Sequence, residues 1–298
     1  MNKIEKKTFH VHLVSDATGE TINNLARACL VQFDHVHVEE HFWSLIRNKR
    51  QLDLVIEGLR QWPGLVLYTF VDEALRKALN DQCRKMGITS YAVLEPILSV
   101  MANHFGMQSG QNPGKQHVLD ADYFARIDAM DYAMSLDDGN QMEKLNDADV
   151  VILGVSRTSK TPTCIYLSHR GIRAANVPIV PEIPIDIASF RLVKPLVVGL
   201  TKDVESLVET RKTRVRFLQD NDKINYVDIE KVQQEVLEAR RLFARLGCPV
   251  IDVSRRSIEE TAAEIMMLIN KRNMEREIAK MATDQMDGPK EEEKDKEP

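Results

Sequence analysis

The sequence is poor in cysteine, and its cysteines form no pair of the kind that binds a metal or closes a small disulfide scaffold. Cys29, Cys83, Cys164 and Cys248 lie far apart in a chain of 298 residues. A chain of this length buries a sizeable core without disulfides, and widely spaced cysteines are typical of proteins in a reducing compartment. We therefore expect reduced thiols and a cytoplasmic location.

Long hydrophobic runs are also absent. No window approaches the roughly 20 apolar residues that a membrane-spanning helix needs. Near the start, Lys3, Lys6 and Lys7 are followed by apolar residues that alternate with histidines, so the hydrophobic core of a signal peptide is missing. The sequence therefore predicts a protein that has no membrane partner.

An excess of positive charge is the third absence. The chain has 40 Lys and Arg residues against 45 Asp and Glu residues, and its formal net charge is −5. Much of this negative charge lies in the acidic stretch 284–298, so the rest is nearly neutral. Because nucleic-acid-binding domains need a basic surface, we expect no nucleic-acid partner.

The sequence does contain a regular alternation of strand-like and helix-like segments. This order is typical of parallel sheets that are covered by helices. We therefore expect an α/β fold with two parallel-sheet α/β domains, the second with a P-loop-like nucleotide site. The expected division is an N-terminal α/β domain at 1–145, a nucleotide-binding and catalytic domain at 146–275, and a charged, disordered tail at 276–298.

The most informative stretch begins with the apolar run at 150–153, which is short and β-branched enough to be a strand buried on both faces. Gly154 allows the chain to reverse after this strand. The small and polar residues at 156–161 can point backbone N–H groups into a concavity, and a helix is expected at 163–169. A strand, a loop and a helix N-terminus together form a phosphate site.

The loop matches the P-loop pattern at Gly154, Lys160 and Thr161, with Ser159 where the second glycine is expected. Serine hardly adopts the positive φ that glycine adopts freely, so either the loop has a different shape or Ser159 offers its hydroxyl to a phosphate oxygen. In the functional interpretation Lys160 contacts the outer phosphate and Thr161 helps to hold Mg²⁺. Arg157 then neutralises the charge that develops during transfer.

A structural interpretation of the same loop stays open. Ser159 or Thr161 would be the N-cap of the helix, and Pro162 would lie near its first position. The functional interpretation assigns nucleotide binding to all eight loop residues: Gly154, Val155, Ser156, Arg157, Thr158, Ser159, Lys160 and Thr161.

An acid near the attacking oxygen is also needed for phosphoryl transfer to a hydroxyl. Asp186, in a proline-rich stretch, and Asp203, after the strand expected at 196–200, are the catalytic candidates, although Asp203 is also a natural N-cap. Asp137 begins an Asp-Asp-Gly sequence that could assist a metal or form a helix-terminating turn. Arg211 and Arg214 could bind phosphate, or pair with a nearby acid or solvent.

A second strand, loop and helix unit occurs near the start of the chain. Asp16, Thr18 and Gly19 could line a ligand site at the carboxyl end of the first strand, or serve as a cap and a turn.

Five of the eight histidines lie in this first region: His10, His12, His35, His37 and His41. Histidines at alternate positions can face one way on a strand and ligate a metal, but the same alternation produces a solvated sheet face. The sequence shows no carboxylate or cysteine cluster that completes a metal site.

The sequence closely resembles the bacterial pyruvate, phosphate dikinase regulatory protein family. The resemblance rests on Gly154-Val-Ser-Arg-Thr-Ser-Lys-Thr-Pro162 and on Val14-Ser-Asp-Ala-Thr-Gly-Glu-Thr21, and it extends over most of the chain. Thr158-Ser159 resembles the branch that acts on pyruvate, phosphate dikinase, since the sister branch, which acts on phosphoenolpyruvate synthase, tends to carry Cys-Gly there.

The resemblance implies a bifunctional enzyme. As a serine/threonine kinase it uses ADP to phosphorylate an active-site threonine of the dikinase, which inactivates the dikinase and leaves AMP. As a phosphorylase it removes that phosphate with inorganic phosphate and releases pyrophosphate. A homodimer is a family-level expectation. The alternatives are a P-loop small-molecule kinase that uses ATP and a nucleotide-sensing regulator without chemistry.

Overall fold

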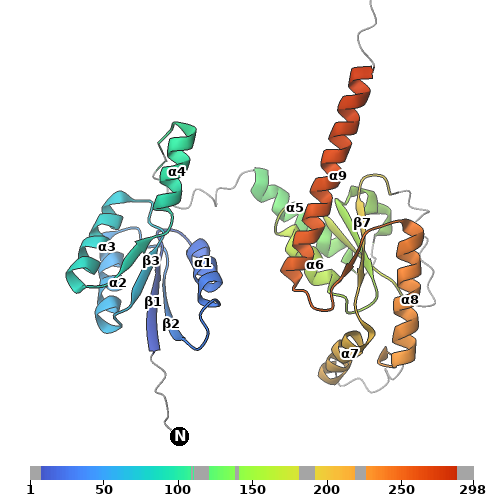
Figure 1. The fold of residues 1–298 in the computed structure, drawn as a ribbon, viewed down its shortest axis with the longest axis horizontal. Helices are drawn as coiled ribbons and strands as arrows, with labels where there is room; N and C mark the ends of the chain where they lie inside the picture. Colours follow the sequence, from blue (N-terminus) through green and yellow to red (C-terminus); the bar gives the residue numbers. More distant parts are fainter. Residues whose placement is uncertain are drawn as a thin grey trace, which may run out of the picture. The chain divides into compact units, whose positions relative to one another are not determined.

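The computed structural model describes residues 8–108, 110, 121–137, 141–180, 192–218 and 226–286. The chain divides into two compact units, Met1–Val118 and Leu119–Pro298, which we call unit 1 and unit 2 (Figure 1). Each unit contains a four-stranded sheet in which all neighbouring strands are parallel. The expected α/β class with two parallel sheets is therefore confirmed.

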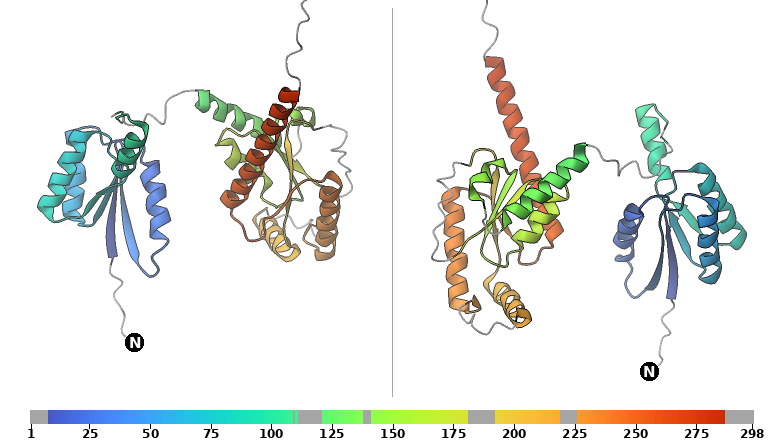
Figure 2. Two further views of the ribbon diagram at one scale, coloured as in Figure 1. Left: turned by 45° about the horizontal axis from the view of Figure 1, so that its top comes forward. Right: turned by 180° about the vertical axis from the view of Figure 1, so that it is seen from behind.

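Unit 1 has the strand order β2-β1-β3-β4. Val11 and Leu13 of β1 pack with α1 on one face, whereas Val14 packs with α2 and α3 on the other (Figure 2). The elements are β1 (Thr8–Val14), α1 (Glu20–Leu30), β2 (His37–Trp43), α2 (Lys49–Gln61), β3 (Leu65–Tyr68), α3 (Glu73–Met86), β4 (Ser90–Ala92) and α4 (Glu95–Phe105).

Unit 2 has the strand order β6-β5-β7-β8, and its central strand β5 is the apolar run of the sequence. Residues 150–153 are fully buried because α5, α6 and α9 cover one face of the sheet and α7 and α8 cover the other. The elements are α5 (Ala121–Ser135), the 3₁₀ helix η3 (Met142–Asp147), β5 (Val150–Gly154), α6 (Lys160–Ser168), β6 (Ala174–Pro178), β7 (Leu196–Thr201), α7 (Val204–Leu218), α8 (Ile229–Leu246), β8 (Val250–Asp252) and α9 (Ile258–Met286).

The two sheets share one connectivity, in which the first strand lies between the second and the third. The strand order reverses beside this first strand, and open α/β sheets bind ligands in the crevice outside the carboxyl ends of the strands at such a point. The loops that follow β1 and β5 therefore occupy the ligand-binding position of their sheets.

Two expected boundaries differ from the structure. The division between units falls between Val118 and Leu119 rather than after residue 145. The reason is that α5 packs on the sheet of unit 2 through the buried Ala129 and Ala133. At the other end, α9 continues to Met286 instead of ending near residue 275. None of the helices in the described ranges is long and apolar enough to cross a membrane.

All four cysteines are free thiols. Cys29 on α1 is exposed, Cys83 and Cys164 are buried, and Cys248 is intermediate. Burial raises the pKa of the Cys83, Cys164 and Cys248 thiols, because the charged thiolate is poorly solvated in the interior.

Candidate functional site

The loop between β5 and α6 turns through two residues in the left-handed conformation. Arg157 has φ 76° and Ser159 has φ 61°. This conformation costs a residue other than glycine roughly 1–2 kcal/mol, and such strain gathers at ligand sites. Ser159 thus adopts the conformation that we expected only of glycine, and it lies at the N-cap of α6 without a capping side-chain bond.

Gly154 is required for a different reason from the one we expected. It does not have a positive φ, so the reversal of the chain occurs later, at Arg157 and Ser159. A Cβ at Gly154 would lie 2.7 Å from Thr158 Oγ1 and 2.8 Å from the backbone oxygen of Leu200. Only glycine lets the loop lie this close to β7.

Two buried polar side chains donate hydrogen bonds to the backbone of the loop. Thr158 is fully buried, and its hydroxyl donates to the Val155 carbonyl oxygen at 2.9 Å. The Lys160 ammonium donates to the same oxygen at 2.9 Å, and only 6% of this residue is exposed. The lysine of the P-loop pattern is therefore held against the loop and places a positive charge beside its backbone.

Arg211 on α7 holds the loop through a hydrogen bond to its backbone. It is buried, and its Nη2 donates to Glu235 Oε2 at 2.6 Å and to the Ser156 carbonyl oxygen at 3.3 Å. The guanidinium also lies 4.5 Å from the centre of the Tyr226 ring, whose hydroxyl is 2.9 Å from Ser156 Oγ. The partner of Arg211 is thus Glu235 on α8, and the buried guanidinium orients the loop.

A cluster of oxygen ligands lies at the start of α6. Thr161 Oγ1 donates to Asp137 Oδ1 at 3.0 Å, and Asn176 Nδ2 donates to Asp137 Oδ1 at 2.6 Å and lies 2.9 Å from Thr161 Oγ1. Within the described ranges, the buried Asn176 Oδ1 has no hydrogen-bond partner. Carboxylate and hydroxyl oxygens are ligands that Mg²⁺ prefers, so Asp137 and Thr161 fit the expected metal, whereas Asn176 presents its amide nitrogen to them.

A cavity of about 470 Å³ opens over the loop. Its volume lies within the range of small-molecule sites, about 300–1,000 Å³. Three cationic side chains, Arg157, Lys160 and Arg214, line it beside the N-terminus of α6, so its electrostatics favour an anion. The complete lining is Ser156, Arg157, Ser159, Lys160, Thr161, Pro162, Pro178, Thr210 and Arg214.

The two acids that we considered as catalytic candidates are not part of this lining. Asp203 is the cap of α7, since its Oδ1 accepts from the Ser206 backbone N–H at 2.9 Å. Asp186 lies outside the described residues. Asp137 was recognised in the sequence only as an alternative to a turn, because its contact with Thr161 spans 24 positions in the chain.

The corresponding loop of unit 1 has a structural role. Asp16 is 1% exposed, and its Oδ2 accepts from the backbone N–H groups of Val71 at 2.7 Å and Asp72 at 3.4 Å. Gly19 has φ 81° and packs against the Phe42 ring. Asp16 therefore ties β1 to the start of α3. The turn that we expected at Gly19 is present, but the N-cap of α1 is Gly19 itself rather than Thr18, and no side chain caps this helix.

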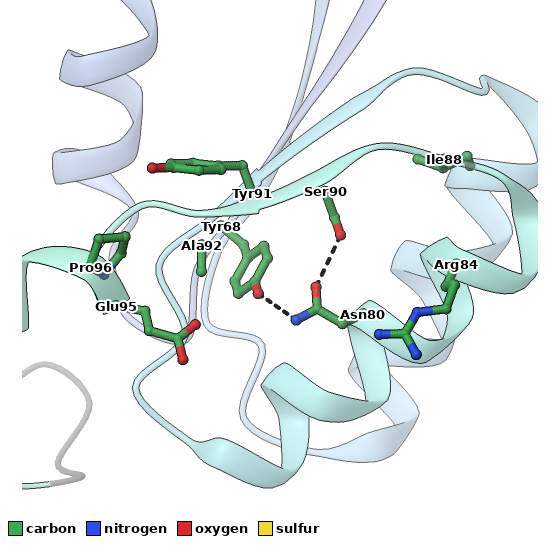
Figure 3. Close-up of a pocket in the computed structure, with 9 residues that line it drawn as sticks. All are labelled: Tyr68, Asn80, Arg84, Ile88, Ser90, Tyr91, Ala92, Glu95 and Pro96. Carbon is green, nitrogen blue, oxygen red and sulfur yellow. Dashed lines mark hydrogen bonds between the residues drawn. The ribbon is translucent and has the colours of Figure 1, made fainter. Parts of the chain in front are cut away.

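A larger cavity of about 520 Å³ lies between β4 and α3 of unit 1 (Figure 3). Asn80 bridges it, donating to the Tyr68 hydroxyl at 2.7 Å and accepting from Ser90 Oγ at 3.0 Å. Its lining carries Arg84 together with Glu95, so the charges balance. The cavity over the β5–α6 loop, with three cations, is the better candidate for a phosphate ligand.

A parallel α/β sheet whose central strand leads through a cation-lined loop into a helix is typical of the class of proteins that bind phosphoryl groups. Within this class the chain belongs to the kinase/pyrophosphorylase family, whose sequence profile matches residues 11–266.

Curated relatives match most of the chain, and each carries the provisional name pyruvate, phosphate dikinase regulatory protein. The relative from Paramagnetospirillum magneticum is 49% identical over 276 residues, which cover 91% of this chain and 89% of the relative. Those from Rhodospirillum rubrum and Caulobacter vibrioides are 50% and 48% identical, covering 87% and 88% of this chain and 94% and 83% of the relatives.

Proposed function

We propose that the chain is a bifunctional regulator of pyruvate, phosphate dikinase. As a kinase it transfers the β-phosphoryl group of ADP to an active-site threonine of the dikinase, inactivates it and leaves AMP. As a phosphorylase it uses inorganic phosphate to remove that group and releases pyrophosphate. The name of the relatives supports the partner, and the four free thiols fit a cytoplasmic location.

The cation-lined cavity at the N-terminus of α6 is the observation that carries this proposal. Phosphoryl transfer depends on positioning and on neutralising charge, with little covalent chemistry for the protein to perform. The loop of residues 154–161 supplies backbone N–H groups, and Lys160 and Arg157 supply fixed positive charges. Arg214 adds a third cation at the rim.

Thr161 and Asp137 would hold Mg²⁺ beside the phosphates. When bound, the ion would neutralise part of the phosphate charge. Asp203 and Asp186 stay candidates for accepting the threonine proton.

One loop serves both reactions in this proposal. In the forward direction the threonine oxygen attacks the β-phosphorus of ADP, and the bond to the α-phosphate breaks. In the other direction an oxygen of inorganic phosphate attacks the phosphothreonine phosphorus, and the bond to the threonine oxygen breaks. The β-phosphoryl group of ADP and the incoming inorganic phosphate are both anions next to the same threonine oxygen, so the same cations can neutralise both.

The proposal is tested by incubating the chain with purified dikinase and ADP, then with inorganic phosphate, while AMP and pyrophosphate are measured. Replacing Lys160 with alanine removes a fixed cation, so we expect both rates to fall about 100-fold or more. Lys212→Ala, on the exposed side of α7, is the control and should leave both rates unchanged.

Each rival function has its own result in this experiment. A small-molecule kinase would consume ATP without the dikinase, and a regulator without chemistry would bind ADP and form no AMP. Full retention of either activity in Lys160→Ala would show that the two reactions use separate phosphate sites. Light scattering of the same preparation tests the expected homodimer.

A further inference from the structure

Two neighbouring strands of unit 1 bring two histidines and a carboxylate to one face of the sheet. In the parallel register His10 of β1 lies opposite Glu39 of β2, and His12 lies opposite His41. Side chains two positions apart on a strand point to the same face. His10, Glu39 and His41 therefore share a face, and Glu39 supplies the carboxylate that the sequence pattern alone did not place.

The ligand atoms of these three residues are spaced like those around a metal ion. His10 Nδ1 lies 3.0 Å from His41 Nε2 and 3.5 Å from Glu39 Oε2. All three ligand atoms lie within 4.8 Å of one another. Zinc–nitrogen distances of about 2.0–2.1 Å in a tetrahedral shell separate two ligand atoms by about 3.4 Å, which is close to the observed spacing.

His12 lies beside this cluster and is not one of its ligands. Its Nε2 donates to the Trp62 carbonyl oxygen at 2.8 Å, and its Nδ1 accepts from Trp43 Nε1 at 3.1 Å. Both ring nitrogens of His12 are thus used, so it is a neutral imidazole that cannot ligate a metal through a free lone pair.

The ring of His41 is held in place from two sides. It stacks on the His12 ring with 4.5 Å between centroids and on the Trp62 ring with 5.0 Å. Outer contacts that fix the orientation of a ligating ring are a regular feature of metal sites.

The charge of the cluster also suits a metal. A carboxylate beside two imidazoles adds the negative charge that a divalent cation needs.

We propose that His10, Glu39 and His41 form a binding site for a divalent transition-metal ion, with Zn²⁺ as the best fit. Two imidazoles and one carboxylate are a ligand set of known zinc sites, and solvent fills the fourth position. Imidazole ligands disfavour Mg²⁺ and Ca²⁺, which prefer oxygen. The site joins β1 to β2, so the bound ion stabilises unit 1.

The test uses the full chain without an affinity tag, after treatment with a chelator that is then removed. Zn²⁺ and Co²⁺ are titrated by calorimetry at neutral pH, and the visible spectrum of the Co²⁺ form is recorded. We expect one ion per chain, a tetrahedral Co²⁺ spectrum and a higher melting temperature with Zn²⁺, because the ion binds the folded state.

The variants locate the site. His41→Ala should weaken Zn²⁺ binding at least tenfold. Glu39→Gln should weaken it several-fold; because the Glu39 side chain is 53% exposed, we expect this variant to fold normally. His104→Ala, an exposed histidine on α4, is the matched control and should bind like the unchanged chain. Equal binding by Glu39→Gln and the unchanged chain, or a loss in His104→Ala as large as in His41→Ala, would overturn the proposal.

Discussion

At the scale of single residues, the phosphate loop shows what a spacing pattern can and cannot predict. The positions of Gly154, Lys160 and Thr161 were readable, because a loop that surrounds an anion repeats the same residue types at the same intervals. The reason why glycine is needed at position 154 could not be predicted from the sequence, since a contact that excludes a side chain there comes from Leu200 on another strand. Likewise, Asp137 and Asn176 reach Thr161 only through the fold.

The close approach at Gly154 predicts a large effect of one methyl group. In Gly154→Ala the new Cβ meets the backbone oxygen of Leu200, which cannot rotate away, so the loop must shift. We expect the free energy of unfolding to fall by about 1–3 kcal/mol, as in other overpacked sites. Calorimetric titration should show ADP affinity reduced at least tenfold, about 1.4 kcal/mol.

Gly87→Ala is the comparison for this variant. Gly87 has a positive φ of 67° but open space around it, so alanine adds backbone strain in unit 1 without a clash. It should cost about 1 kcal/mol of stability and leave ADP affinity unchanged. Normal ADP binding by Gly154→Ala would show that the loop does not depend on its close packing against β7.

At the scale of elements, helices α7 and α8 do more than cover the sheet. Their buried ion pair, Arg211 with Glu235, reaches the Ser156 carbonyl oxygen of the loop. The strands and helices themselves were predictable, because the runs of apolar residues and the capping residues are local signals. The pairing of Arg211 was not, since sequence neighbours such as Glu209 offered an equally good partner and the two helices had to be packed first.

Removing Glu235 should therefore disturb the loop through Arg211, which contacts the loop backbone. Glu235→Ala leaves a buried guanidinium without its counter-charge, which typically costs about 3–5 kcal/mol. The double variant Arg211→Met with Glu235→Leu should recover most of this stability. It should still bind ADP more weakly than the unchanged chain, because the Ser156 carbonyl oxygen has lost its donor.

Urea unfolding and ADP titration of the two variants separate these effects. Glu238→Ala, an exposed acid one turn further along α8, should change neither measurement. If the double variant bound ADP as well as the unchanged chain, Arg211 would be a purely structural residue with no role in orienting the loop.

At the scale of the whole molecule, the two units have separate hydrophobic cores. Each of the four hydrophobic clusters among the described residues lies entirely within one unit. The existence of two α/β domains was predictable from the alternation of elements. Their boundary was misplaced because α5 precedes the domain's first strand, and only the packing of its buried Ala133 shows which sheet it covers.

This separation predicts that residues 119–298 fold alone. The fragment contains the complete sheet, the loop, Asp137 and the Arg211 support, so it should unfold cooperatively and bind ADP as tightly as the full chain. Circular dichroism and calorimetric titration measure both. A matched fragment, residues 1–118, should fold without binding ADP; an unfolded 119–298 fragment would show that its core depends on unit 1.

The distribution of the thiols has a practical consequence for following this molecule in solution. Cys83 and Cys164 are buried and Cys248 is half-buried, and burial raises the pKa of all three thiols, whereas Cys29 on α1 faces solvent. A maleimide dye added to the native chain will therefore react first at Cys29. The sequence thus already provides a preferred attachment point for a fluorescent reporter, outside the phosphate loop.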